Sequence, residues 1–389
     1  MRRELNQPLP GPPEPWTPSM MPSFRGRPPY LMSEMIAAEP GLAERLVHRL
    51  TVDPVLDELA GAVREAVTAG RPVLTTGCGT SEHAAMGLAL LLSEALDLPI
   101  GREIRSIPPL EMLGRPVADG ILVAVSHEGG THVTNEALRE ARAAGARTAL
   151  ITVGSGSPGA GLADLVVTTG EQDQSWAHTV GYLSPLLVGV VLAARLAGRR
   201  ADALAIRAVL DVTDDPHAAA AVASALAGVD RLIVAGSGPD HVSARELALK
   251  IAEGARLPTA GLELEAVLHG HLAAATRWTG LVLVLTHADA GPGAAHLHQR
   301  AARVLRAAKA LGVPAAAILA EPLAGEVAAD DTPAGRIVTP RTERVGGVTG
   351  SLLGAAVALQ LLAERLARAR GTNPDTLGRE DAAQAAAHA

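Results

Sequence analysis

Three ionisable residues in the second half of the chain have a spacing that suits proton chemistry. Glu246, Lys250 and Glu253 stand at positions i, i+4 and i+7, which a helix would carry on one face. A partly buried carboxylate with a raised pKa can remove a proton from carbon and return it to the adjacent carbon. The same spacing is also typical of a solvated ion-pair face, so spacing alone leaves both interpretations open.

His269 comes after these residues, in a Leu-His-Gly segment that is typical of a turn. An imidazole titrates near neutral pH, so it can accept a proton at one atom of a ligand and donate a proton at another. By itself, however, a single histidine in a turn is more often structural than catalytic.

Two loops rich in glycine and hydroxyl groups in the first half could bind an anion. One is Gly77-Cys78-Gly79-Thr80-Ser81, and the other is Ser126-His127-Glu128-Gly129-Gly130-Thr131; each follows an apolar run. In doubly wound sheets ligands bind beyond the carboxyl ends of the strands, where helix N-termini offer N–H groups. A Ser or Thr at a helix start is more often a simple N-cap, but two such loops in one half favour a binding site.

The elements that must position these residues alternate along the chain. Short β-branched and leucine-rich runs are followed by alanine-rich helical patterns, which favours βαβ units and parallel sheets covered on both faces. The fold class is therefore α/β. The predicted strands are Val73–Thr76, Ile121–Val125, Thr148–Val153 and Leu165–Thr168 in the first half, and Leu232–Ala235, Leu281–Leu285, Ala315–Leu319 and Ile337–Thr339 in the second.

The second half repeats the first. Ile121–His127 aligns with Leu281–His287, and Gly77 aligns with Gly236 at nearly the same offset. We predict a flexible proline-rich arm at residues 1–30, a first domain with its leading helices at 31–210, a second domain at 217–370 and a C-terminal tail at 371–389. Long apolar helices at Tyr182–Leu196 and Ser351–Leu366 are predicted to close the halves, and the turn formers of Asp211–Pro216 mark the linker.

Composition excludes several classes of partner. The net charge is −7 without a strongly basic stretch, so nucleic acid is not expected. Cys78 is the only cysteine, which excludes an intrachain disulfide and favours a reducing compartment. The segment Met1–Tyr30 lacks the apolar region of a signal peptide, and the apolar stretch Leu186–Ala194 is too short to span a bilayer. We expect a cytoplasmic protein with a small-molecule partner.

The paired loops, the duplicated halves, the Glu-x-x-x-Lys-x-x-Glu pattern and the histidine after it resemble the sugar isomerase (SIS) domain family. Within that family the likeness is to the isomerase half of the glutamine–fructose-6-phosphate aminotransferases and to their deaminase relatives. It runs from about Tyr30 to Asp375, and Met32–Pro40 looks like the family's first helix. The resemblance implies two tandem flavodoxin-like parallel-sheet domains, each a doubly wound αβα sandwich.

The resemblance also implies a role for each candidate residue. Glu253 would shuttle the proton between C1 and C2, with Glu246 and Lys250 beside it. His269 would open the sugar ring from the neighbouring subunit of a homodimer with a shared site. Neither a metal nor an organic cofactor is implied. The residues implied around the substrate phosphate or its equivalent are Thr80, Ser81, Ser126, His127, Thr131 and the intervening Glu128 and Gly129, and those implied to line the sugar are Ala177, His178 and Thr179.

Three departures from the family pattern bear on the reaction. A glutamine-hydrolysing domain is expected to be absent, because the chain opens Met1-Arg2-Arg3 and reaches the isomerase region almost at once. The tail at 371–389 has no lysine for an imine with the sugar. Glu128 stands where the family usually has a serine, and a carboxylate about 4 Å from a phosphate costs on the order of 4 kcal/mol at an effective dielectric near 20.

Glu128 leaves three possibilities open. Its side chain turns away from the ligand, or His127, His132 or His178 offsets its charge, or the ligand carries no phosphate. His178 itself replaces a family serine. The first expectation is an isomerase or deaminase for an (amino)sugar phosphate. The alternatives are an isomerase or deglycase for an unphosphorylated amino sugar, and a non-catalytic sugar-phosphate-binding regulator.

Overall fold

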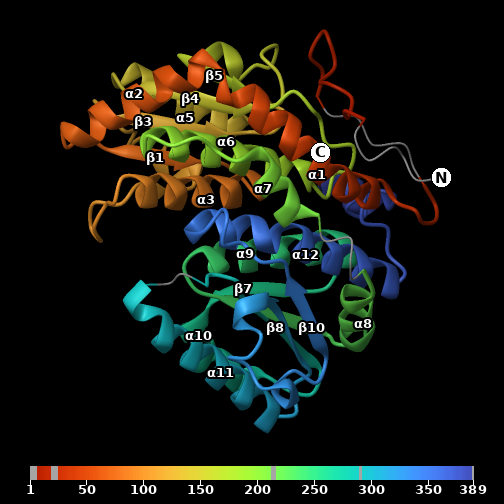
Figure 1. Cartoon of the computed structure of the whole chain (residues 1–389). Helices are drawn as coiled ribbons and strands as arrows, with labels where there is room; N and C mark the ends of the chain where they lie inside the picture. Colours follow the sequence, from red (N-terminus) through yellow and green to blue (C-terminus); the bar gives the residue numbers. More distant parts are fainter. Residues whose placement is uncertain (1–6, 19–24, 212–215, 289–290, 388–389) are drawn as a thin grey trace. The chain divides into compact units, whose positions relative to one another are not determined.

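The computed structural model describes residues 7–18, 25–211, 216–288 and 291–387. The chain divides into two compact units (Figure 1). Residues 212–215 of the predicted linker lie outside the described residues. The first unit contains the described residues of Met1–Met20, Ala38–Asp173 and Val180–Arg207, and the second contains those of Met21–Ala37, Gln174–Thr179 and Ala208–Ala389.

The first unit is built on a parallel five-stranded sheet of order β2-β1-β3-β4-β5. β3 is buried along its whole length because helices cover both faces of the sheet. Leu122 and Ala124 of β3 pack on one face against Leu138 and Ala141 of α5. The strands are β1 (Val73–Thr76), β2 (Arg105–Ser106), β3 (Ile121–Val125), β4 (Arg147–Thr152) and β5 (Leu165–Thr168).

Helices α2, α3 and α6 pack together beside this sheet, and α4, α5 and η1 pack beside it as a second group. The long apolar helix predicted from Tyr182 begins at Val180, and its only partly exposed residues are near its C-terminus. The helices are α1 (Leu31–Thr51), α2 (Pro54–Thr68), α3 (Thr80–Ala95), α4 (Pro109–Met112), α5 (His132–Ala143), η1 (Ala160–Leu162), α6 (Val180–Leu196) and α7 (Ala203–Leu210).

The second unit has its own parallel sheet, of order β10-β9-β8-β6-β7. Figure 1 shows α9 and α12 along one side of this sheet and α10 and α11 along the other. Val304 and Leu305 of α11 share a core with Leu281 and Leu283 of β8. The strands are β6 (Arg231–Gly236), β7 (Thr259–Glu263), β8 (Thr279–Leu285), β9 (Ala315–Ala320) and β10 (Gly335–Thr339).

The helices of the second unit include one that is long and apolar. α12 could cross a membrane by length and composition, but 83% of its apolar window is buried, and it packs against α8 and α9 of the same unit. These are the properties of a core helix. The helices are α8 (Pro216–Leu226), α9 (Pro239–Ala255), α10 (Leu264–Leu268), η2 (His271–Ala274), η3 (Gly291–Gly293), α11 (Ala294–Ala310), η4 (Glu321–Leu323), η5 (Ala329–Asp331), α12 (Gly347–Ala369) and α13 (Ala382–Ala387).

The two sheets have the same topology. Read from the β2 edge and from the β7 edge, both follow the flavodoxin-like order 2-1-3-4-5, which confirms the predicted tandem α/β fold. The turns after β1 and β6 also match, because Gly79 and Gly238 both have φ 58° and ψ −127°. A side chain is strained at this positive φ, so both turns favour glycine.

All eight predicted strands are present, with ends shifted by up to two residues. β2 and β7 were not predicted. β2 is only two residues long, and β7 reads Thr-Ala-Gly-Leu-Glu without a clear alternation of apolar and polar residues. Both strands form sheet edges, where hydrogen bonding to one neighbour is enough to define a strand and the sequence signal is weak.

Candidate functional site

The two glycine loops flank the point in the first sheet where the strand order reverses. One follows β1 and the other follows β3, and these strands are hydrogen-bonded neighbours. Thr80 is the first residue of α3 and is buried, whereas Ser81 is half-buried. Open α/β sheets bind ligands at such a reversal point, beyond the carboxyl ends of the strands. The geometry therefore makes these loops the candidate binding site of the first unit.

The second loop is held in one shape by its own hydrogen bonds. Gly129 has φ +68°, and a Cβ there would lie 2.0 Å from Ser157 Oγ, so only glycine fits. The Gly129 N–H donates to Ser126 O (3.1 Å), and Gly129 O accepts from Gly159 N (2.8 Å). The Ser126 hydroxyl donates to Thr131 Oγ1 (3.3 Å). The loop therefore presents its hydroxyl groups from a fixed backbone.

His127 is buried in this loop and is held as a hydrogen-bond acceptor. Its Nε2 accepts from the main-chain N–H of Asp173 at 3.0 Å, so this nitrogen carries no proton while the bond is made. A ring in this state is neutral and cannot offset the charge of the half-buried Glu128. His132 has an exposed ring, and its Nδ1 lies 3.7 Å from Glu136 Oε1.

In the second unit, α9 carries the three ionisable residues on a buried face. Glu246 and Lys250 are fully buried, and the side chain of Glu253 is 22% exposed. Lys250 Nζ lies 2.5 Å from Glu253 Oε2 and 3.7 Å from Glu246 Oε1. The solvated ion-pair face, which spacing left open, is thus wrong for this helix. One lysine serves two carboxylates, and only Glu253 reaches solvent.

The segment that precedes α6 brings a histidine into the electrostatic field of these residues. Burial, and then the positive charge of Lys250, lowers the pKa of His178 from 6.5 to about 4, although Glu246 acts in the opposite direction. His178 is therefore neutral near pH 7. Its neighbours Ala177 and Thr179 are fully buried, and Thr179 O accepts a hydrogen bond from Gln360 Nε2 (3.4 Å).

His269 lies elsewhere in the same unit. It follows α10 in the predicted turn, its side chain is 70% exposed, and its Nε2 lies 2.8 Å from Glu265 Oε1. A hydrogen bond from Arg300, assisted by His269, lowers the pKa of Glu265 to about 2. α10, which His269 follows, and α9, which carries Glu253, lie on opposite sides of the sheet (Figure 1).

The sequence pattern of the SIS domain family matches residues 69–195, which include β1, β3 and both glycine loops. This region is a SIS domain. The glutamine–fructose-6-phosphate aminotransferase (isomerizing) of Symbiobacterium thermophilum is 29% identical over 384 residues, which cover 92% of this chain and 59% of that protein. Its counterpart in Halobacterium salinarum is 32% identical over 224 residues, which cover 54% of this chain and 37% of the relative. The chain thus spans less than two thirds of the length of these relatives.

Solved structures show the same tandem SIS fold. The C-terminal domain of glucosamine-fructose-6-phosphate aminotransferase from Francisella tularensis has a TM-score of 0.74 at 18% identity, covering 91% of this chain and 100% of that one. Tagatose-6-phosphate ketose/aldose isomerase from Escherichia coli has a TM-score of 0.69 at 17% identity, covering 92% of this chain and 98% of that one. At these identities the likeness establishes the fold.

In the second SIS fold, a carboxylate of the chain itself occupies the position that is equivalent to the loop site of the first. Asp240 aligns with Ser81 at the offset that relates Gly236 to Gly77, lies in the first turn of α9 and is fully buried. Its Oδ2 accepts from the main-chain N–H groups of Thr286 (3.0 Å) and His287 (3.2 Å), and its Oδ1 accepts from the Ser351 hydroxyl (2.9 Å). This arrangement of loops therefore can bind an oxyanion. Aligning the halves residue by residue gives the signal that sequence analysis missed.

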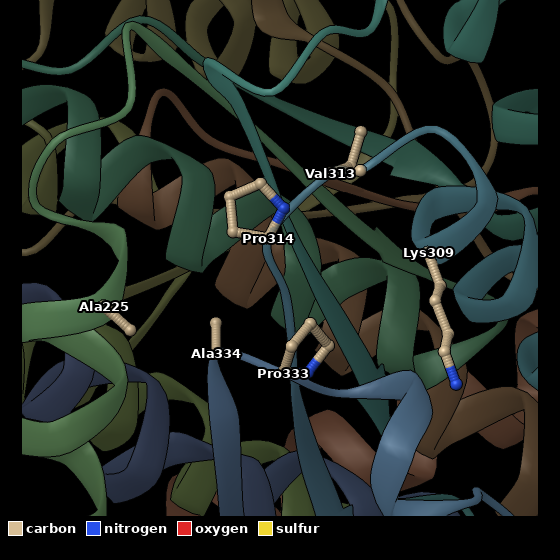
Figure 2. Close-up of a pocket in the computed structure, with 7 residues that line it drawn as sticks. Ala225, Lys309, Val313, Pro314, Pro333 and Ala334 are labelled. Carbon is tan, nitrogen blue, oxygen red and sulfur yellow. The ribbon is translucent and has the colours of Figure 1, made fainter.

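A cavity of about 330 Å³ in the second SIS fold lies at the other edge of the sheet. It is lined by residues just before β9 and β10, including Pro314 and Pro333 (Figure 2). Lys309, its one charged lining residue, pairs with Asp331 at 3.3 Å. This is the amino-terminal edge of the strands, away from the edge where open α/β sheets bind ligands. Among the described residues, no group of three or more His, Cys, Asp or Glu side chains is arranged to hold a metal ion.

Proposed function

We propose that this SIS-domain protein is an isomerase or deaminase for an (amino)sugar phosphate, with Glu253 as its base. The observation that carries the proposal is the Lys250–Glu253 pair: a buried lysine 2.5 Å from a carboxylate that alone of the three α9 residues reaches solvent. Lys250 favours the ionised carboxylate, which is the form that accepts a proton. The side chain of Glu253 is partly exposed, so a substrate can reach it.

The proposed reaction moves one proton between adjacent carbons. Glu253 takes the proton from C1 or C2 of the open sugar, and the electrons of the C–H bond form the C1–C2 double bond of an enediol or enolamine as the carbonyl oxygen or imine nitrogen takes a proton from water. Glu253 then returns its proton to the other carbon, while the hydroxyl on the carbon that was first deprotonated releases its proton to water and becomes the new carbonyl. Neutral His178, whose pKa Lys250 and Glu246 influence, would accept or donate hydrogen bonds without adding charge. Neither a metal nor an organic cofactor is required for this chemistry.

The loops of the first unit are the proposed site for the phosphate. The support comes from the duplicate: at the position of Asp240, whose carboxylate occupies the second half, the first half has the neutral hydroxyl of Ser81. The first half thus has no carboxylate at this position, and its loops carry the hydroxyl groups of Thr80, Ser126 and Thr131. An anionic group of a ligand would take the place that the carboxylate takes in the copy.

The proposed working form is a homodimer. The side chain of His269 is 70% exposed, and the helix before it lies on the side of the sheet opposite α9 (Figure 1), which supports a role in the site of a partner subunit. Glu265 fixes its Nε2, so the ring has a defined orientation. Cytoplasmic localisation also remains a prediction.

Glu128 supports a second candidate, an isomerase or deglycase for an unphosphorylated amino sugar. Its half-buried carboxylate belongs to the loop proposed for the phosphate, where His127 does not neutralise it. A carboxylate there would repel a phosphate and attract an ammonium group.

Incubation of the protein in deuterated water with phosphorylated and unphosphorylated hexoses and hexosamines tests both candidates. Deuterium at C1 or C2 of glucosamine 6-phosphate or fructose 6-phosphate supports the first. Deuterium only in unphosphorylated glucosamine supports the second. Binding of sugar phosphates without deuterium in any sugar would instead indicate a non-catalytic regulator.

A further inference from the structure

The proline-rich segment at residues 7–18 packs against the first unit. Leu9 is buried, and its N–H donates to Glu171 Oε2 (2.8 Å), a carboxylate that Arg45 also holds. Pro10 O accepts from the main-chain N–H of Gln172 (2.9 Å). Pro12 packs so closely on Gly154 that a Cβ there would lie 2.5 Å from the proline ring. These contacts fix the direction of the residues that follow.

Trp16 brings this segment onto the proposed phosphate loop. Its indole Nε1 donates to Glu128 O at 2.9 Å, and a Cβ on Gly130 would lie 2.9 Å from the Trp16 ring. The glycine is therefore required for the ring to lie where it does. The contact joins residues 112 positions apart in sequence.

The hydrogen bond from Trp16 completes the fixation of one peptide unit. The peptide between Glu128 and Gly129 donates through Gly129 N to Ser126 O (3.1 Å) and accepts through Glu128 O from Trp16. A planar trans peptide held at both its N–H and its C=O cannot rotate without breaking a bond. Glycine is flexible enough to permit such a rotation at position 129, so the second bond restricts a motion that the sequence would otherwise allow.

We propose that Trp16 is a positioning residue for oxyanion binding at this loop, acting through the main-chain oxygen of Glu128. The proposal rests on the proposed function for the identity of the anion, a sugar phosphate. Trp16 fixes the peptide next to the hydroxyls of Ser126 and Thr131, and it does so independently of the side chain at position 128.

Two variants separate the indole hydrogen bond from ring packing in the full-length chain. Trp16→Phe keeps an aromatic ring beside Gly130 but removes the N–H, and Trp16→Ala removes both. Trp278→Phe is the matched control, because Trp278 is half-exposed in the second unit and stacks on Arg277. Hydrogen–deuterium exchange of peptides covering 126–131 and calorimetry with glucosamine 6-phosphate and with glucosamine are the measurements.

We expect Trp16→Phe to speed amide exchange at 128–130. It should also lower the binding affinity for glucosamine 6-phosphate by about two- to twelvefold, the factor for one neutral hydrogen bond. Trp16→Ala should lower this affinity at least as much. Glucosamine affinity and the melting temperature of Trp16→Phe should stay close to those of Trp278→Phe. The same factor should appear in a Glu128→Ser background, where the main-chain oxygen remains.

Unchanged exchange at 128–130 in both Trp16 variants overturns the proposal. So does an equal loss of both ligands together with a lower melting temperature, which marks a general structural role. If the wild-type protein binds no sugar phosphate, the proposed function fails for that ligand. In that case, the amide exchange at 128–130 alone tests whether Trp16 fixes the loop.

Discussion

At the scale of single residues, the position of Lys250 determines how Glu253 can act. A fully buried ammonium group must be paired, and Lys250 has Glu246 on one side and Glu253 on the other. Sequence spacing predicted that the three residues share a helix face. It could not predict burial of that face, because the same spacing occurs on solvated helices and burial depends on residues distant in sequence, such as those of α12.

Trp16 and Asp240 show two different limits of sequence analysis at this scale. The alignment of the halves already placed Asp240 opposite Ser81, so a residue-by-residue comparison would have revealed the internal carboxylate. No spacing rule connects Trp16 with Glu128, since the residues between them fold into most of the first unit. That contact required the structure.

The depressed pKa of His178 predicts a dependence of stability on pH. Between about pH 4 and pH 6.5 the unfolded chain protonates this histidine and the folded chain does not, so His178 makes stability fall as the pH falls through this window. Urea unfolding at pH 5 and pH 7 should show a smaller difference for His178→Gln than for the wild type. An equal difference would contradict the low pKa.

At the scale of elements, the period of apolar residues was enough to place most of the strands and the long helices. Strands buried on both faces, such as β3 and β8, read as continuous apolar runs and were found almost to the residue. The edge strands β2 and β7 were missed, because an edge strand needs few apolar residues to form hydrogen bonds with its one neighbouring strand. The glycines after β1 and β6 could be recognised as turns, but their shared φ and ψ could not.

Because the β–turn–α elements are duplicated, a residue of the second half can be introduced at the equivalent position of the first. Ser81→Asp would introduce into the first half the carboxylate that Asp240 provides in the second. We expect this substitution to weaken binding of glucosamine 6-phosphate by more than about tenfold, because like charges about 4 Å apart repel by on the order of 4 kcal/mol at an effective dielectric near 20. Ser81→Ala, which removes one hydroxyl donor, should have a smaller effect. Calorimetry compares the three proteins, and an affinity of Ser81→Asp equal to the wild type would exclude an anion at this turn.

At the scale of the whole molecule, the proposed homodimer combines residues of two chains in one site. Within one second unit, α9 and α10 lie on opposite sides of the sheet (Figure 1), and in the proposed dimer a partner supplies the histidine to the site of Glu253. The resemblance of the sequence to its family implied this arrangement, and nothing in the periodicity or composition of the chain could have done so.

Mixing two inactive variants tests the shared site. Glu253→Gln and His269→Ala should each lose activity as pure proteins, and mixed dimers should recover part of it, because one of their two sites has both wild-type residues. Subunit exchange is verified with a mass label before activity is measured. If exchange is complete and activity stays absent, each site is built from one chain.

Deuterium incorporation by the Glu253→Gln variant tests the role of Glu253 most directly. The amide keeps the shape and much of the hydrogen bonding of the carboxylate but cannot accept the proton from carbon. In deuterated water, the wild type should exchange the hydrogen at C1 or C2 of its sugar substrate. Glu253→Gln should lose this exchange by about 100-fold or more, the lower end of typical general-base contributions, while calorimetry shows sugar binding within a few-fold of the wild type. Full exchange by Glu253→Gln would contradict the assignment of Glu253 as the base.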